Sequence, residues 1–447
     1  MKKLGGDMIK IGKKIKGVIE RDKNIIFTTT RSPYPFVADR FDGYYAYDVE
    51  GNKYLDFSTF ISIYNFGKEG LELVKHAVKL QAEKLMHSAF QDFYAELPVT
   101  AAEKLVSLLP SGFGRVFFSN SGTEANEDAI KLARLFTKRP YLLAFYNSFH
   151  GRSLGSLSMT SSKVAQRAHL GPFVGFYHAF YPNPYRCPFH SSSPEECAEE
   201  SLDFIENFLF RKVVSPEEIA GIFVEPVQGE GGYIVPPKEF IIGLRKLADE
   251  HNILLIDDEI QAGLMRTGKF VAMDHFGVKA DIYTFAKALG GGLPLGATVA
   301  KRSLGDTPEG SHAGTFGGNL LSIAASNALL DYIKRNRAKL EQMAARKGSM
   351  ILKRLNEMRE SYELVGDARG LGMMLAIELV KSKESKEPAT KEREAVLNKC
   401  FEKGLILLGS GESSIRIIPA ITMPEELINK GLDVLEEAIK EVSNKGA

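Results

Sequence analysis

From about Arg115 onward, short apolar runs alternate with stretches long enough to form a helix, and this rhythm is the strongest constraint on the fold. The apolar runs are Val116–Phe118, Tyr141–Phe145, Ile222–Val224, Ile253–Ile256 and Leu295–Ala300. Strands separated by whole helices are typical of a mostly parallel sheet, because a parallel pair needs a long crossover connection. We therefore expect an α/β body over this part of the chain.

The segments on either side of this body have patterns of their own. Aromatic and polar residues alternate over Tyr44–Phe57 around Glu50-Gly51-Asn52, which indicates a β-hairpin. Residues 322–362 contain no proline and repeat apolar residues at helical spacing. This spacing predicts a long helix, or a pair of helices, that leaves the body.

The last part of the chain predicts a second domain. Apolar strands at Met373–Val380 and Ile415–Ile418 flank a helix, and an amphipathic helix follows them. We expect residues 61–330 to form the larger domain. Residues 1–60, with the hairpin, should join residues 331–447 in a smaller α/β domain.

Charge and cysteine content argue against several classes of protein. The chain has 57 Lys and Arg and 56 Asp and Glu, so no overall field attracts nucleic acid or an anionic membrane. No apolar run approaches the ~20 residues of a membrane-spanning helix. Cys187, Cys197 and Cys400 are too few and too scattered for a disulfide framework or a metal-binding knuckle. We expect reduced thiols, no metal site and a cytoplasmic location.

The amino-terminal segment Met1–Lys23 is rich in lysine. It lacks the continuous apolar stretch and the small-residue cleavage site of a signal peptide. We expect a solvated, helical lead-in.

The segment Ser119–Glu124 joins the apolar run Val116–Phe118 to a helix with an apolar face. Free backbone N–H groups and the positive end of a helix dipole meet at such a place, and together they bind phosphate. The same residues, Ser121 above all, also suit an N-capped turn that binds nothing. Both interpretations stay open on this segment alone.

Three acids, Asp257, Asp258 and Glu259, directly follow the run Ile253–Ile256. The carboxyl ends of parallel strands face the ligand crevice, so at least one of these acids should act on a ligand. A nucleotide triphosphatase places a magnesium-binding acid similarly, and Gly263–Lys269 approaches a phosphate-binding loop. Phe270 has no hydroxyl to bind magnesium, which argues against that alternative.

Lys287 ends an apolar run, Ile282–Ala286, and three glycines follow shortly after it. An amine in an apolar setting has a lowered pKa and can form a Schiff base. A lone lysine near a turn is more often a surface residue. A phosphate cradle, a buried acid and this lysine together, however, match the phosphate, ring nitrogen and aldehyde of pyridoxal phosphate.

These residues carry a resemblance to the class III (ω-amino acid type) aminotransferases, which extends over nearly the full chain. The resembling segments are Ser119–Asn126, Phe149–Arg152, Glu225–Gly232, Asp258–Gln261 with Arg266–Gly268, Thr284–Gly292 and Gly314–Phe316. The resemblance implies the α/β fold type I of pyridoxal-phosphate-dependent transferases. This fold has a large domain with a mostly parallel sheet and a smaller α/β carboxy-terminal domain.

The resemblance also implies roles around the cofactor ring. Lys287 would bind the aldehyde, and Asp258 would pair with the protonated ring nitrogen. Gln261 would lie near the phenolic oxygen. Phe149 would stack on the ring where relatives commonly have Tyr, so stacking survives but any role of that hydroxyl does not.

For the phosphate, the resemblance implies Gly122 and Thr123, with Ser121 beside them. Thr315 would reach the phosphate bound by the partner subunit of a homodimer.

For the substrate, the chain most resembles 4-aminobutyrate aminotransferases, in which Ile61, Arg152, Glu230 and Arg416 would contact it. Arg152 would clamp the far carboxylate of 2-oxoglutarate and Arg416 the α-carboxylate. Glu230 would neutralise Arg416 when the donor has no α-carboxylate. On the residues alone, an edge-strand charge at Arg416 and a solvated loop residue at Glu230 remain alternatives.

The expected activity is amino transfer from 4-aminobutyrate, or a similar ω-amino acid, to 2-oxoglutarate. An amino-acid racemase or epimerase would share the same cofactor residues. An ornithine or other class III aminotransferase is a further alternative, and so is a cofactor-carrying scaffold without turnover. The intact Lys287 argues against the scaffold.

Overall fold

The structure is a computed structural model that describes residues 9, 11–30, 33–171 and 173–444. Most of the predicted amino-terminal lead-in before residue 11 lies outside the described residues. The rest of it confirms the prediction, because helix α1 covers Lys13–Ile25. Among the described residues, no helix combines the length and apolarity needed to cross a membrane.

The chain divides into two compact units. Residues 72–342 form the larger unit, and residues up to 71 with those from 343 form the smaller unit. Two helices run across the limits of the units, α3 (Gly67–Ala82) and α10 (Leu320–Ser361). Helix α10 confirms the long helix predicted from the proline-free segment.

The larger unit is built on a seven-stranded sheet in the order β4-β10-β9-β8-β7-β5-β6. Strands β5 to β9 are parallel, and β10 runs antiparallel to both β9 and β4. This confirms the mostly parallel sheet and every apolar run predicted for it. The strands are β4 (Phe113–Ser119), β5 (Tyr141–Phe145), β6 (Phe176–Ala179), β7 (Ile219–Val224), β8 (Leu254–Asp258), β9 (Ile282–Phe285) and β10 (Gly296–Lys301).

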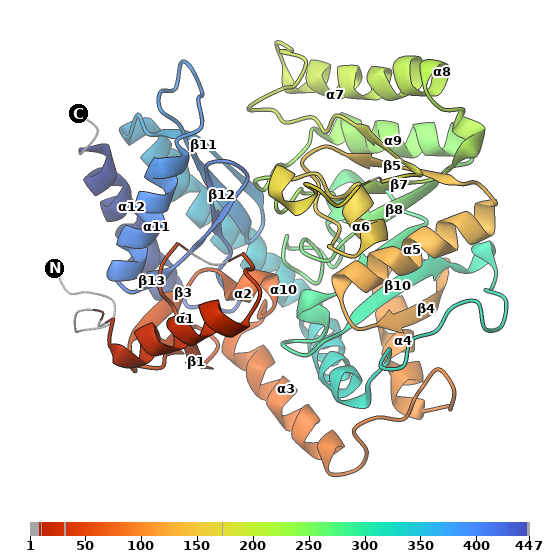
Figure 1. The fold of residues 1–447 in the computed structure, drawn as a ribbon, viewed down its shortest axis with the longest axis horizontal. Helices are drawn as coiled ribbons and strands as arrows, with labels where there is room; N and C mark the ends of the chain where they lie inside the picture. The colour runs from red at the N-terminus through yellow and green to blue at the C-terminus, as the bar shows by residue number, and fades with distance from the viewer. Residues whose placement is uncertain (1–8, 10, 31–32, 172, 445–447) are drawn as a thin grey trace. The chain divides into compact units, whose positions relative to one another are not determined.

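Helices cover both faces of this sheet, with α5 along one face and α9 along the other (Figure 1). Helix α5 turns small residues such as Ala129 and Ala133 toward Leu142 and Phe223 of the strands, so it packs closely. On the opposite face, the ring of Phe145 packs 5.4 Å from that of Phe240 on α9. The helices of this unit are α4 (Glu96–Leu108), α5 (Gly122–Thr137), α6 (Leu154–Met159), α7 (Pro194–Asp203), α8 (Phe210–Lys212) and α9 (Lys238–Glu250).

The close packing of α5 has a functional consequence. Each fully buried apolar side chain of this core stabilises the fold by about 1.5–3 kcal/mol, so the helix is held firmly in one position. Its first residue, Gly122, follows the end of β4 after a short turn. The amino end of α5 therefore has a fixed place at the carboxyl edge of the sheet.

The smaller unit contains two four-stranded sheets, β1-β2-β3-β13 and β11-β12-β15-β14. Strands β2 and β3 are antiparallel and form the predicted hairpin. The strands are β1 (Ala38–Phe41), β2 (Tyr45–Asp48), β3 (Lys53–Asp56), β11 (Val365–Leu371), β12 (Met374–Leu379), β13 (Leu405–Ile406), β14 (Leu408–Ser410) and β15 (Ser414–Ile417). The helices are α1, a single turn α2 (Thr59–Ser62), α11 (Thr390–Glu402) and α12 (Glu425–Ser443).

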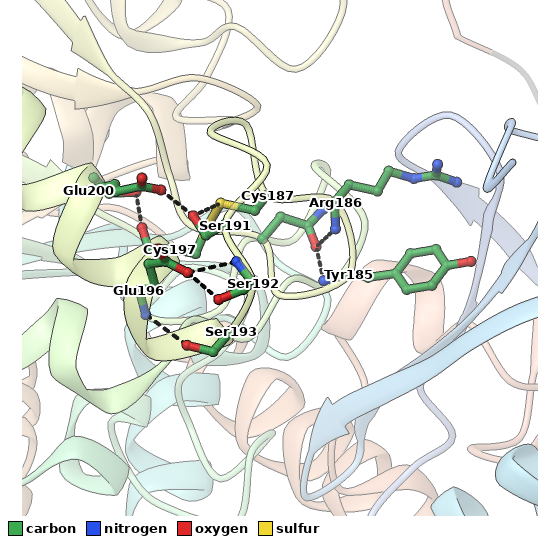
Figure 2. The surroundings of a disulfide bond; sticks show 11 residues. Tyr185, Arg186, Cys187, Ser191, Ser192, Ser193, Glu196, Cys197 and Glu200 are labelled. Carbon is green, nitrogen blue, oxygen red and sulfur yellow. Dashed lines mark hydrogen bonds between the residues drawn. A yellow bond between two sulfur atoms is a disulfide. The ribbon is translucent and has the colours of Figure 1, made fainter. Parts of the chain in front are cut away.

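The expectation of reduced thiols is wrong for two of the three cysteines. Cys187 and Cys197 form a disulfide, with their Cα atoms 6.0 Å apart (Figure 2). Ser193 caps α7 by accepting the N–H of Glu196, and Glu196 accepts the N–H of Ser192. This capped turn reverses the chain and brings Cys197, in the first turns of α7, back to Cys187. The spacing of the cysteines alone did not reveal the reversal.

We expect the Cys187–Cys197 bond to stabilise the larger unit. Closing a loop of this size in the unfolded chain contributes roughly 2–3 kcal/mol. Replacing both cysteines by serine should lower the free energy of unfolding by about that amount, measured in urea at pH 7. Serine at Cys400, which is free and buried, is the control. If alkylation of the unfolded, unreduced protein labels all three cysteines, the bond is absent in solution and the correction fails.

Candidate active site

The turn between β4 and α5 has the geometry of an anion cradle. Ser121 is the N-cap of α5 and accepts the N–H of Glu124, and the Glu124 carboxylate accepts the N–H of Asn120. The N–H groups of Gly122 and Thr123, in the first turn of α5, can donate to an anion bound at the positive end of the helix. A Cβ on Gly122 would lie 3.0 Å from Ile260, so glycine permits the close approach of the turn to the strand ends.

The side chain of Thr123 faces the start of α6. Its Oγ1 lies 2.9 Å from Ser153 Oγ and accepts the N–H of Arg152 at 3.1 Å. Gly151 adopts φ +138°, and a Cβ there would lie 2.1 Å from Thr123 Oγ1. The contact therefore fastens the start of α6 to α5, and what Thr123 offers an anion at the helix end is its backbone N–H.

Asp258, the last residue of β8, lies at the centre of a buried hydrogen-bond network. Its Oδ2 lies 2.7 Å from Nδ1 of His150 and accepts a hydrogen bond from Nδ2 of Asn126 at 2.8 Å. Its Oδ1 accepts the N–H of Ile260. Asn126 is fixed in turn, because Thr284 on β9 donates to its Oδ1 at 2.8 Å. Asp258 is thus a buried carboxylate with one fixed orientation.

The pKa of His150 is raised. Complete burial would lower it, but the hydrogen bond to the Asp258 carboxylate and the charge of that group outweigh the effect of burial. The raised pKa favours a cationic imidazole beside the Asp258 carboxylate. Sequence reasoning gave no role to His150, Asn126 or Thr284, although each lies within a segment that carries the resemblance.

Glu225 supports the same region from the end of β7. It is buried and accepts the N–H groups of Phe149 and Gly229, each at 3.0 Å. Burial raises its pKa to about 7, His150 opposes this shift, and the nearby charge of Asp258 adds to it. Glu225 holds the backbone on which the predicted stacking ring of Phe149 depends.

Lys287 lies just after β9, next to β8 in the sheet. It is half-buried and adopts φ +47°, a left-handed conformation that L residues rarely adopt. Gly291 and Gly292 also have positive φ, so the chain turns sharply behind the lysine. Because β8 and β9 are parallel, the backbone of Lys287 lies at the same edge of the sheet as Asp258.

The glycine-rich loop after β7 holds Glu230 and packs against Gln261. A Cβ on Gly229 would lie 2.2 Å from Nε2 of Gln261, whose Oε1 accepts the hydroxyl of Tyr233 at 2.7 Å. Glu230 forms an ion pair with Lys163, with 2.8 Å between Nζ and Oε1. Lys163 had no predicted role, and no pattern in the sequence distinguishes it.

The other predicted residues of the larger unit are exposed. Arg152 is exposed, with its guanidinium carbon 5.7 Å from the ring centroid of Phe149. Thr315 is also exposed, in the loop before α10. The larger unit therefore brings Asp258, Lys287 and the cradle to one edge of its sheet.

Two predicted substrate residues belong to the smaller unit. Ile61 lies in the single turn α2, where four successive residues, Thr59 to Ser62, have positive φ. Arg416 lies on β15, is 4% exposed, and donates its Nε–H to the carbonyl of Gly409 at 2.9 Å. The bulk of Arg416 is therefore held among strands of its own unit.

Residues 26–439 of the chain match the family description Aminotransferase class-III. The chain belongs to the class III aminotransferases. It is 39% identical over 427 residues to the leucine/methionine racemase of Thermococcus litoralis, with 95% of each chain covered. It is 35% identical over 431 residues to the 4-aminobutyrate aminotransferase of Escherichia coli, covering 95% of this chain and 98% of that one.

A comparison with solved structures also finds an aminotransferase. The crystal structure of taurine:2-oxoglutarate aminotransferase from Bifidobacterium kashiwanohense, in complex with PLP and glutamate, matches with a TM-score of 0.89 at 28% identity. The match covers 98% of this chain and 99% of that one. These findings confirm the predicted fold type I and a pyridoxal-phosphate-dependent aminotransferase.

The residues present fit pyridoxal phosphate. The amino end of α5 suits the phosphate, the fixed carboxylate of Asp258 suits a protonated ring nitrogen, and the amine of Lys287 suits the aldehyde. When bound, the cofactor supplies an electron sink for the carbon that carries the amino group. The individual roles of Asp258 and Lys287 stay predictions, as do those of the other site residues, Ser121, Gly122, Thr123, Phe149, Gln261 and Thr315.

Asp257 and Glu259 lie on the opposite face of the strand from Asp258, because side chains alternate along it. Both are fully buried. Burial, with the charge of Glu259, raises the pKa of Asp257 well above its usual range, and burial raises that of Glu259 to about 8. At least one of the two is therefore protonated at neutral pH.

This acid pair predicts how stability depends on pH. Above the usual pKa of a carboxyl group the folded chain holds a proton that the unfolded chain releases, so stability should fall as pH rises toward about 8, where Glu259 loses its proton in the folded chain. Asp257→Asn removes one acid, so it should make this slope shallower and stabilise the protein more at pH 8.5 than at pH 5. Urea unfolding across pH 5–9 measures this.

Asp92→Asn, the same change at an exposed site, is the control and should keep the wild-type slope. An unchanged slope in Asp257→Asn would show that the pair is not the source of the pH dependence.

Proposed function

We propose that the enzyme moves the amino group of 4-aminobutyrate, or of a similar ω-amino acid, to 2-oxoglutarate, giving a semialdehyde and glutamate. The observation that carries the proposal is the exposed guanidinium of Arg152 beside the ring of Phe149. If Phe149 stacks on the cofactor, Arg152 offers a cation to the far carboxylate of either substrate.

In this proposal the larger unit binds the cofactor and supplies the reacting groups. Lys287 Nζ would take a proton from the carbon that carries the amino group and deliver it to the cofactor within the same half-reaction, and the second half-reaction would reverse this transfer. Asp258, with His150 behind it, balances the positive charge on the ring nitrogen throughout. Ile61 would add an apolar contact to the substrate chain.

The α-carboxylate distinguishes the two substrates. We propose that Arg416 binds this carboxylate in 2-oxoglutarate, and that Glu230 neutralises Arg416 when the ω-donor is bound. The ion pair with Lys163 supports this role, because Glu230 keeps a cationic partner whenever Arg416 is occupied by a carboxylate.

We also propose that the active form is a cytoplasmic homodimer without nucleic-acid or membrane partners. Thr315 of each subunit would donate to the phosphate bound in the other subunit. The exposure of Thr315 supports this proposal, since its hydroxyl is available to a second chain.

Racemisation of α-amino acids is the second candidate, and a specific observation favours it. The racemase of Thermococcus litoralis is 39% identical to this chain, against 35% for the 4-aminobutyrate aminotransferase of Escherichia coli. A racemase uses the same cofactor residues and returns the proton to the α-carbon. Incubating a single L-amino acid without an oxo acid and assaying its D form separates this candidate from amino transfer.

Lys287 should be the residue attached to the cofactor. Borohydride treatment of the holoenzyme should leave the cofactor on the peptide that contains Lys287, as read by mass spectrometry. Lys287→Ala should lower amino transfer by at least about a thousandfold, because the covalent attachment and the proton carrier are lost together. Lys279→Ala, at an exposed position, is the control. Label on the peptide of Lys269 or Lys301 would contradict the assignment.

Glu230 and Arg416 should affect opposite half-reactions. Glu230→Gln should slow the 4-aminobutyrate half and spare the glutamate half, because it leaves Arg416 without its neutralising charge. Arg416→Ala should slow the glutamate half by about a hundredfold, as expected for a lost carboxylate clamp of about 3 kcal/mol. Arg152→Ala should slow both halves. Single-turnover absorbance changes of the holoenzyme measure each half.

The matched control for Glu230→Gln is Lys163→Gln, which breaks the same ion pair from its other side but retains the Glu230 carboxylate. It should spare the 4-aminobutyrate half. Equal slowing of both halves by Glu230→Gln would refute the masking role. Failure of 4-aminobutyrate to react with the wild type would refute the proposed donor.

A further inference from the structure

The loop between residues 305 and 319 presents Thr315 on the surface, and its two sides are anchored. On the far side of Thr315, a Cβ on Gly317 would lie 2.3 Å from the carbonyl oxygen of Phe118, so the backbone presses on the end of β4. The N–H of Gly314 donates to the side-chain oxygen of Gln91. Phe316, next to Thr315, stays 59% exposed.

His312 forms the anchor on the near side. Its ring centroid lies 3.9 Å from that of Phe117 on β4. Its Nε2 lies 3.0 Å from Oδ1 of Asp128, and its Nδ1 lies 2.6 Å from Nζ of Lys131. The side chains of His312 and Asp128 are each only 7% exposed. This is a buried polar contact in an otherwise exposed loop.

The chemistry of the three groups fixes the roles of the two ring nitrogens. The ammonium of Lys131 can only donate, so Nδ1 of His312 accepts, and Nε2 is the ring nitrogen that lies beside Asp128. Burial raises the pKa of Asp128, and the hydrogen bond and charge of His312 oppose this shift. His312 therefore links an anion and a cation of one helix.

That helix is α5, whose amino end offers Gly122 and Thr123 to the phosphate. Asp128 and Lys131 lie one to three turns further along it. The same rigid helix thus supports the cradle of its own subunit and, through His312, the loop of Thr315. A pre-ordered loop loses less conformational freedom on binding than a mobile one, and so binds more tightly.

We propose that His312 is a positioning residue for cofactor binding: by joining its loop to Asp128 and Lys131, it holds Thr315 where the hydroxyl reaches the phosphate in the partner subunit. The inference rests on the shared-phosphate dimer of the proposed function. It adds a residue that touches neither cofactor nor substrate but sets how long the cofactor stays bound.

The test measures cofactor loss and loop order in the holoenzyme. His312→Phe keeps a ring against Phe117 but loses both polar contacts, and His312→Gln keeps a donor for Asp128. Cofactor release on dilution is followed by visible absorbance, and hydrogen exchange is followed in the peptides that cover residues 311–318. Thr315→Ala removes the phosphate contact directly, and His76→Phe, at an exposed site on α3, is the matched control.

We expect Thr315→Ala to weaken cofactor retention by about ten- to hundredfold, as for a lost charge-assisted hydrogen bond. His312→Phe should weaken it by about five- to tenfold and speed exchange of the loop peptides, and His312→Gln should recover part of both. The variant that combines His312→Phe with Thr315→Ala should retain the cofactor no worse than Thr315→Ala alone, because both changes remove the same contact. A general loss of folding would instead add to the effect of Thr315→Ala.

Two outcomes separate the inference from the proposal beneath it. If Thr315→Ala retains the cofactor as the wild type does, the shared-phosphate dimer is wrong, and the purpose assigned to His312 is wrong with it. If Thr315→Ala loses the cofactor while His312→Phe retains it, or leaves loop exchange unchanged, the dimer stands and the inference alone is overturned.

Discussion

The hydrogen-bonded carboxylate of Asp258 is the interaction on which the rest of the site depends. An unpaired buried carboxylate would cost several kcal/mol. His150 and Asn126 prevent this by meeting the same oxygen at 2.7 and 2.8 Å. They come from a loop and from α5, and Thr284 on β9 holds Asn126 in place. Holding this one charge therefore requires β8, β9, α5 and the loop of His150 to keep their relative positions. The chemistry of the site thus depends on the packing of the sheet.

The acids at the end of β8 show how a strand separates function from structure. Asp258 faces the side where His150 and Asn126 contact it by hydrogen bonds, whereas Asp257 and Glu259 face a closed interior where burial raises their pKa values. Three neighbouring carboxylates on one face would repel one another strongly. Because side chains alternate, only the middle one meets the ligand edge, and the outer two stay protonated in part. The strand end thus holds a single active charge without the cost of three.

Much of this could be predicted from the sequence, because the decisive signals were local. Buried strands are visible in the sequence as aliphatic runs, and Lys287 comes directly after one of these runs. Strand β6 gave no such signal, since Phe176–Ala179 is half-buried and includes a histidine. The Cys187–Cys197 bond depends on a chain reversal. The partner of Lys163 is 67 residues away in the sequence, and the partner of His312 is more than a hundred residues away. Long-range polar pairs leave no period in a sequence, so they were missed.

The groups that choose the reaction are separate from those that enable it. In the proposed function, amino transfer and racemisation both need Asp258, Lys287 and the amino end of α5, so no measurement on them alone can distinguish the two. The proposal assigns the choice to charges at the rim of the site, where Glu230 is bound by Lys163 and Arg152 is exposed. Rim charges interact through solvent and over longer distances, so each contributes less than the buried network. Under the proposed roles, a few substitutions at the rim would change the substrate while the Asp258 network stays as it is.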